Sequence, residues 1–240
     1  MIVSVIHHTI QIIINKGIYH MKIKFGFVTL IAAALLSTQV NAGDNYWQNH
    51  YKITVTNITK GISFTPLLAS THNRKISIFE IGESASEEVS RVAEGGDIAP
   101  LTALLSESNN VHSTASSNSL LAPGQSVEFE IDGTRKFKKI SMISMLLPTN
   151  DTMLALQSAK LPKHGKATYY MNAYDAGTET NDEYCANIPG PHCGGAPFSP
   201  EDDGEGYIYP SPTIHGEADL SREAYQWNGP VAKVVIERMY

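Results

Sequence analysis

Two short acidic turns place three carboxylates where they could act together. The first turn, residues 147–151, carries Asp151, and the second, residues 174–179, carries Asp175 and Glu179. Each turn follows a run of residues typical of a β-strand, so both turns could lie at the same end of a sheet. Carboxylate oxygens that converge there suit Ca²⁺, which takes about six to eight hard oxygen ligands. The pattern predicts a calcium site in loops at one end of a β-structure.

Other interpretations of these acids stay open. Asp is common in turns because its side chain bonds the nearby backbone, so all three acids could be solvated turn residues without a ligand. A further acidic run, residues 201–205, lacks the spacing of a calcium-binding helix-loop-helix motif, and we interpret it as a solvated loop. Gly177 favours the calcium site, because it lets the chain turn so that Asp175 and Glu179 can face one centre.

The rest of the chain must supply the strands that hold the two turns. Runs that alternate apolar and polar residues, or that are apolar throughout and rich in β-branched residues, indicate strands. Pro66 limits pairing in the second run, which we place at a sheet edge, and the Asp132-Gly133 pair predicts a turn. The predicted strands are residues 51–58, 63–68, 125–131, 137–147, 152–156, 167–173 and 231–239.

One helical insertion interrupts these strands. Between residues 85 and 93 apolar side chains recur at helical spacing, Ser84 or Ser86 can cap a helix, and Gly95-Gly96 ends it. A second short helix is predicted at residues 98–105, and the Ser-, Asn- and Thr-rich stretch 106–119 is predicted to be a surface loop. Because helices do not alternate with strands, the chain is predicted to be an all-β antiparallel sandwich with a short helical insertion.

A long polar segment, residues 179–220, contains both cysteines of the chain. It is too polar and too rich in Pro and Gly to form core, so we predict an elaborate loop. In an oxidising compartment the spacing of Cys185 and Cys193 favours a disulfide that closes this loop. A zinc site is the alternative, although no Cys-x-x-Cys pair anchors it. Its ligands would be Cys185, His192, Cys193 and His215.

The N-terminus indicates export. After Met21 come basic residues, an apolar stretch too short to span a bilayer comfortably, and small residues before a cleavage position after Ala42. Residues 1–42 are therefore predicted to be a signal-peptide region, with Met21 as a candidate true start. The mature domain would be residues 43–240, in the periplasm or outside the cell and without a membrane span. An uncleaved N-terminal membrane anchor is the alternative.

The mature domain is acidic. Removal of Lys16, Lys22 and Lys24 with the leader leaves 15 basic and 24 acidic residues, a net charge of −9. Such a balance argues against nucleic acid and anionic lipid as partners, and it is compatible with binding cations. Aromatic residues in the last third of the chain could form a contact face or could pack the loops. They are Tyr207, Tyr209, Tyr225 and Trp227.

Three segments together resemble the spondin domain, the module found near the N-terminus of F-spondin-type matrix proteins and as a stand-alone exported protein in bacteria. They are residues 148–151 (Pro-Thr-Asn-Asp), 174–179 (Tyr-Asp-Ala-Gly-Thr-Glu) and 230–238 (Pro-Val-Ala-Lys-Val-Val-Ile-Glu-Arg). Their order and spacing match those of the domain, and the likeness extends from about Tyr51 to the C-terminus.

The resemblance implies a C2-like β-sandwich that holds a Ca²⁺ ion in loops at one end. In the family the ligands are the acid after the Pro-containing turn and the two acids of the second turn, here Asp151, Asp175 and Glu179. Glu179 stands where the animal domains carry Asp, so it could bind bidentately, or Asp182 could replace it. The implied function is an exported calcium-binding adhesive module whose partner is a surface protein, a matrix component or a glycan.

An enzyme and a purely structural envelope protein are the alternatives. Asp151 and Asp175 could in principle cleave glycosides, but one acid must be kept protonated by apolar surroundings, and here both are predicted in polar turns. The sequence has no Gly-x-Ser-x-Gly or His-Glu-x-x-His motif. Among six isolated histidines of the mature domain, His72 and His215 are the first to inspect. We therefore predict no catalysis, with a secreted, glycan-directed hydrolase as the first alternative.

Overall fold

A computed structural model describes residues 48–198 and 204–240, so the predicted signal peptide and its cleavage position lie outside the described residues. The strands are β1 (Asn49–Asn57), β2 (Ser63–Phe64), β3 (Leu68–His72), β4 (Val111–Ser116), β5 (Ser126–Gly133), β6 (Lys139–Leu147), β7 (Thr152–Lys160), β8 (Lys166–Asp175), β9 (Tyr209–Pro210) and β10 (Ala232–Arg238). The helices are α1 (Glu87–Gly95), α2 (Ala99–Glu107), α3 (Arg222–Tyr225) and the 3-10 turn η2 (Cys185–Asn187). Within the described ranges no helix is long and apolar enough to cross a membrane.

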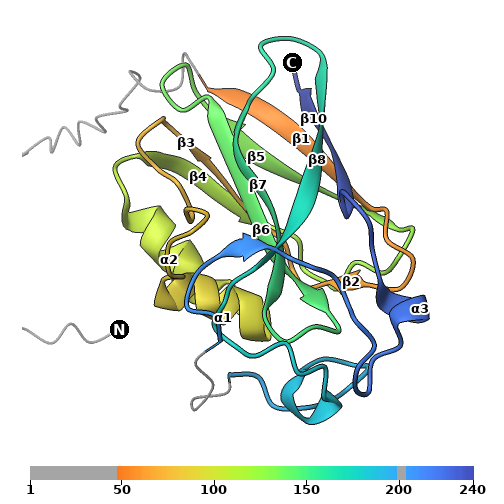
Figure 1. Cartoon of the computed structure of the whole chain (residues 1–240). Helices are drawn as coiled ribbons and strands as arrows, with labels where there is room; N and C mark the ends of the chain where they lie inside the picture. Colours follow the sequence, from red (N-terminus) through yellow and green to blue (C-terminus); the bar gives the residue numbers. More distant parts are fainter. Residues whose placement is uncertain (1–47, 199–203) are drawn as a thin grey trace, which may run out of the picture. The chain divides into compact units, whose positions relative to one another are not determined.

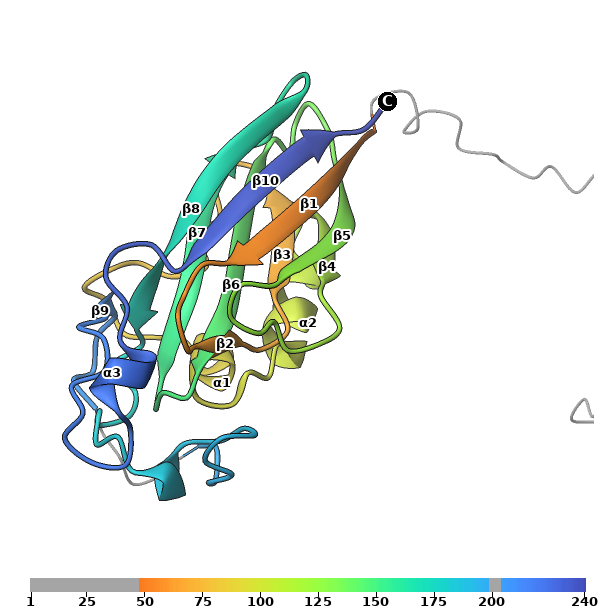
Figure 2. The same cartoon turned by 90° about the vertical axis from the view of Figure 1, so that its right-hand side faces the viewer.

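The strands form one antiparallel path in the order β4-β3-β6-β7-β8-β10-β1-β5, with β2 beside β6 and β9 beside β8. β8 joins two layers, because its first half pairs with β10 and its last four residues pair with β7. The layer of β5, β1 and β10 therefore lies over the layer of β3, β6 and β7 (Figures 1 and 2). β4 and β5, the two ends of the path, contact each other, so the sheet is nearly closed. The predicted all-β antiparallel class with a helical insertion is confirmed.

The main core lies between the two layers. β1 shows why: Ile53 and Val55 are fully buried, whereas the polar residues between them are partly exposed. β6 is buried along nearly its whole length, because α1 and α2 cover the face of its layer that points away from the core (Figure 1). The predicted ends of α1 are confirmed: Ser86 Oγ accepts from Val89 N at 3.3 Å, and Gly96 takes the left-handed conformation with φ 66°.

Three local predictions were wrong. Residues 106–119 are not a single loop, since they hold the end of α2 and strand β4, which pairs with β3. β4 carries no buried residue, so its sequence lacks the apolar alternation that reveals a strand. Asp132 and Gly133 end β5, and the chain turns after them, where Thr134 N donates to Phe137 O at 3.2 Å. The third error concerns the long polar segment.

The segment 179–220 does form a small core of its own. Its buried members are Ile188, Ile214 and Leu220, and Tyr225 and Trp227 pack beside them. The predicted disulfide is confirmed, with Cys185 and Cys193 joined at an S–S distance of 2.07 Å. Both thiols are consumed, so the alternative zinc site loses two of its four ligands. Both cysteines pack beside this satellite core, so the disulfide restricts the unfolded chain around it and thereby stabilises it.

Candidate metal centre

The first residue of β7 and the last residue of β8 bring two of the predicted acids together. Thr152 pairs with Asp175 in the sheet, which sets Asp151 beside the end of β8. Ala176 N also donates to the carbonyl of Asp151 at 3.2 Å. The exposed fractions are 0% for Asp151, 0% for Asp175 and 1% for Glu179. The interpretation of these acids as solvated turn residues was therefore wrong.

Asp151 lies at the centre of this acid cluster, which we define as Asp151, Asp175 and Glu179. Its Oδ2 accepts from the backbone N–H groups of Thr178 at 2.8 Å and Glu179 at 3.1 Å. Its Oδ1 is buried and accepts no hydrogen bond from the described residues. A buried carboxylate oxygen without a donor is rare in native proteins, and it indicates a place for a ligand. A hard carboxylate oxygen of this kind suits Ca²⁺.

The electrostatics of the cluster favour a cation. Burial, followed by the charges of Asp175 and Glu179, raises the pKa of Asp151 to about 8, although two backbone N–H groups act in the opposite direction. Burial also raises the pKa of Asp175, and the charge of Glu205 adds to this effect. Carboxyl groups that repel each other in a dry site become stable as anions when a cation lies between them. The carboxylate oxygens of the acid cluster are therefore suitable ligands for a calcium ion.

Asp175 is held in place by its own turn and by a neighbouring amide. Its Oδ1 accepts from Gly177 N at 2.9 Å, and its Oδ2 accepts from Asn181 Nδ2 at 2.7 Å. Asn181 Nδ2 also lies 3.3 Å from Tyr209 Oη. The charge of Asp175, together with burial as the main cause, raises the pKa of Tyr209. Asn181 and Tyr209 are thus site residues that sequence reasoning missed, because neither is an acid.

The loop after residue 203 closes over the cluster. Gly206 N donates to Gly177 O at 2.8 Å, and a Cβ on Gly177 would lie 2.3 Å from the carbonyl oxygen of Tyr207. Gly177 also has φ 65°, so both its conformation and its surroundings require glycine. Glu205 belongs to the run that we interpreted as a solvated loop. It is exposed as predicted, but its charge acts on Asp175.

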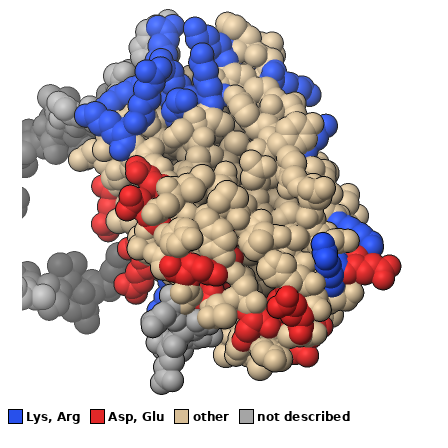
Figure 3. Space-filling view, viewed as in Figure 1, with Lys and Arg blue, Asp and Glu red and all other residues tan. Residues whose placement is uncertain are grey.

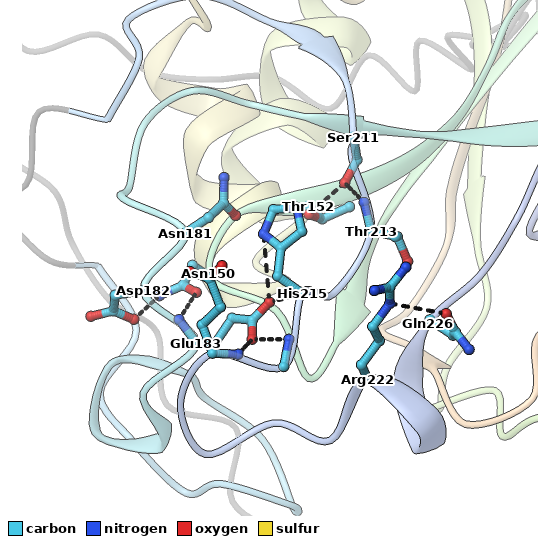
Figure 4. Close-up of polar contacts among 12 residues, drawn as sticks. Asn150, Thr152, Asn181, Asp182, Glu183, Ser211, Thr213, His215, Arg222 and Gln226 are labelled. Atoms are coloured by element: carbon cyan, nitrogen blue, oxygen red, sulfur yellow. Dashed lines mark hydrogen bonds and ion pairs between the residues drawn. The ribbon is translucent and has the colours of Figure 1, made fainter.

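Asp182, the predicted substitute for Glu179, is engaged elsewhere. Its Oδ1 accepts from Asn150 Nδ2 at 2.9 Å and from Tyr184 N at 3.0 Å, and its Oδ2 lies 2.5 Å from Asn187 Nδ2. Figure 4 shows its carboxylate directed toward Asn150. Glu179, by contrast, is buried, and its charge acts on Asp151. The structure thus associates Glu179 rather than Asp182 with the other two acids.

Glu183 is another buried carboxylate, which lies outside the acid cluster and accepts hydrogen bonds from the backbone. Its Oε1 accepts from His215 N at 2.5 Å, and its Oε2 accepts from Gly216 N at 2.7 Å and Glu217 N at 3.0 Å (Figure 4). Its own N–H donates to Asn150 Oδ1 at 3.3 Å. Three successive N–H groups that converge on one anion form a backbone nest. Glu183 therefore links the disulfide segment to the first acidic turn by hydrogen bonds. No local sequence motif predicts this role.

The two histidines singled out by the sequence have structural surroundings. His72 is fully buried, and its ring nitrogens lie 2.7 Å from Asn73 O and 2.8 Å from Ser141 Oγ. Burial lowers the pKa of His72, which favours its neutral form. His215 is exposed at the nest, with Nδ1 4.0 Å from Glu183 Oε1. Among the described residues, no hydrogen bond or ion pair joins either histidine to the acid cluster.

A cleft of about 460 Å³ lies next to these elements. Its lining includes Asn172, Arg222, Gln226 and Trp227 but none of the three acids of the cluster. The argument from sequence that both carboxylates sit in polar, solvated turns does not hold, since the raised pKa of Asp151 is a property that general acids also need. The three carboxylates of the cluster are, however, only 0% to 1% exposed.

The raised pKa of Asp151 predicts how pH affects the calcium-free protein. A group whose pKa in the folded state lies above its unfolded value stabilises the fold below the unfolded pKa and loses that stabilisation as pH rises. The folded value here is about 8, against an ordinary 3.8. With a chelator present, the melting temperature should fall as pH rises from about 5 to about 8. A pH series of melts checks this, and a fall that persists unchanged in Asp151→Asn would assign it to other groups.

A comparison with known protein families finds one match. The family model described as Spondin_N matches residues 43–189, which is more than half of the chain. The match includes both acidic turns and Cys185, whereas β10 and Cys193 lie beyond it. No curated protein matches the chain.

Proposed function

The chain belongs to the Spondin_N family, and on that premise we propose that it is an exported, calcium-stabilised module that binds a surface or matrix partner without catalysing a reaction. The observation that carries the calcium proposal is Asp151 Oδ1, a fully buried carboxylate oxygen that accepts no hydrogen bond from the described residues. Asp175 and Glu179 would supply further carboxylate oxygens to the same ion. The family and the disulfide are both consistent with an extracellular or secreted protein.

The absence of catalysis is proposed from the burial of the acids. A carboxylate that acts on a substrate must reach it, and the three acids of the cluster lie under the loops of residues 176–183 and 204–207. Asp151 and Asp175 are instead anchored by backbone and amide donors, as expected of ligands held ready for an ion. The ion would serve to hold the loops at this end of the sandwich.

Thermal melts test the calcium proposal. A ligand that binds the folded state stabilises it by about 2.7 kcal/mol at a hundred times its dissociation constant. For a domain of this size we expect calcium to raise the melting temperature by about 5–10 °C over the chelated protein. Magnesium at the same concentration should do much less, because it is smaller and gives up its water reluctantly. Identical melts with calcium and with chelator would refute the metal site.

A further inference from the structure

The cations of this acidic chain gather at one end of the sandwich. Figure 3 shows Lys and Arg concentrated at the top, where Figure 1 places the hairpin tips, and Asp and Glu over the lower part. Fifteen of the 18 Lys and Arg residues follow residue 42, and ten of these lie on the strand ends and tips of that end. We call them the basic end. They are Arg74, Lys75, Arg135, Lys136, Lys138, Lys139, Lys160, Lys163, Lys166 and Arg238.

Strand register shows that the basic end is one surface. Lys139 pairs with Lys160, so cations from β6 and β7 lie side by side in one row, and Arg74 and Lys75 follow the end of β3, whose last residue pairs with Lys139. Leu161 N donates to Lys138 O at 3.0 Å, which sets the tip between β7 and β8 against the tip between β5 and β6. Neighbouring strands are about 4.8 Å apart, so the row presents closely spaced positive charges.

This arrangement opposes stability. Like charges directly across a pair of strands destabilise a sheet, and Lys139 and Lys160 occupy such a position. Acids at this end offset only part of the positive charge. Asp132 accepts from Gln48 Nε2 at 2.7 Å and lies 2.5 Å from His50 Nδ1, while Glu237 pairs with Lys166 at 3.2 Å. Charges that are concentrated at a cost to the fold indicate a ligand of opposite charge.

We propose that the basic end binds an anionic polysaccharide, a chain that carries sulfate or carboxylate groups at regular intervals. The proposal rests on the binding part of the proposed function, whose partner class it specifies, but not on calcium, because the acid cluster lies at the opposite end of β7 and β8. Repeated anions match a row of cations in spacing and sign. The aromatic residue of the tip between β5 and β6, Phe137, stacks on His112 with ring centroids 5.5 Å apart, so this tip offers a membrane no protruding aromatic side chain.

Charge reversal at the basic end tests this proposal. Lys75, Lys138 and Lys163 are exposed and come from three different segments, so we choose the triple variant in which each is replaced by Glu. The probes are heparin, which is sulfated, and hyaluronan, which carries only carboxylates. At low salt the unaltered protein should bind at least one of them, and the triple variant should bind it at least about tenfold more weakly. Binding should also weaken steeply as salt is raised.

A second triple variant controls for net charge. Lys60, Arg222 and Lys233 are exposed and lie away from the basic end, so their replacement by Glu changes the net charge equally and should leave the affinity within about twofold. Binding should be the same with calcium and with chelator below the melting transition, which separates this proposal from the calcium site. The proposal is overturned if neither polysaccharide binds, if both triple variants lose affinity equally, or if anionic phospholipid vesicles bind more tightly than either polysaccharide.

Discussion

Asp151→Asn is expected to stabilise the calcium-free protein and to abolish its stabilisation by calcium. The two effects have one cause, because the carboxylate is fully buried and lies near the charges of Asp175 and Glu179. Without an ion, Asp151 must either stay ionised beside its charged neighbours or take up a proton well above its ordinary pKa, and the neutral amide removes this cost. The amide oxygen can still accept from Thr178 N and Glu179 N. We expect the chelated variant to melt a few degrees above the unaltered protein, and calcium to shift it by less than about 1 °C.

Asp182→Asn is the matched control for this experiment. It makes the same chemical change in an acid whose oxygens accept from Asn150, Tyr184 and Asn187 rather than facing the cluster. Its melting temperature should still rise with calcium by the full amount, whatever its stability in chelator. A full calcium response in Asp151→Asn would contradict the assignment of Asp151 as a ligand. So would a chelated Asp151→Asn that melts well below the unaltered protein.

The meeting of the acids could be predicted from the sequence, but their burial could not. Asp151 precedes one strand and Asp175 ends the next, so antiparallel pairing alone brings them together. Their cover comes from residues far along the chain, including Gly206 and Tyr209, which no local pattern connects with the acidic turns. Sequence reasoning therefore predicted three acids that converge in polar turns, and it could not show that long-range folding buries them.

The fold shows the same division between local and long-range information. Strands with an apolar face, such as β1 and β6, were predicted because one or both of their faces meet a core. β4 was missed because it is held by pairing with β3 rather than by burial of its side chains. Net charge carries little information for a related reason: a value of −9 for residues 43–240 does not show that most of their cations lie at one end. The order of the strands in the sheet decides where the cations lie.

Glu183→Ala is expected to lower the melting temperature by roughly 10 °C. The substitution removes the acceptor of three backbone N–H groups, those of residues 215–217, and each hydrogen bond to a charged group contributes about 1.5–3 kcal/mol when it is buried. Partial access of water to these N–H groups reduces the total, so we expect a loss of about 3 kcal/mol. Thermal melts in excess calcium measure it. Glu183→Gln, which keeps one oxygen acceptor, should lose about half as much.

The calcium response separates the two kinds of buried carboxylate in this domain. Glu183 faces a nest of N–H groups, so its negative charge is already stabilised without a cation, whereas Asp151 keeps one oxygen without a described donor. Glu183→Gln should therefore keep the full rise of melting temperature with calcium while starting from a lower value. Glu217→Ala, an exposed change in the same loop, should leave both values unaltered. Loss of the calcium response in Glu183→Gln would show that the disulfide segment and the acid cluster act as one site, because Glu183 N bonds to Asn150 at the first acidic turn.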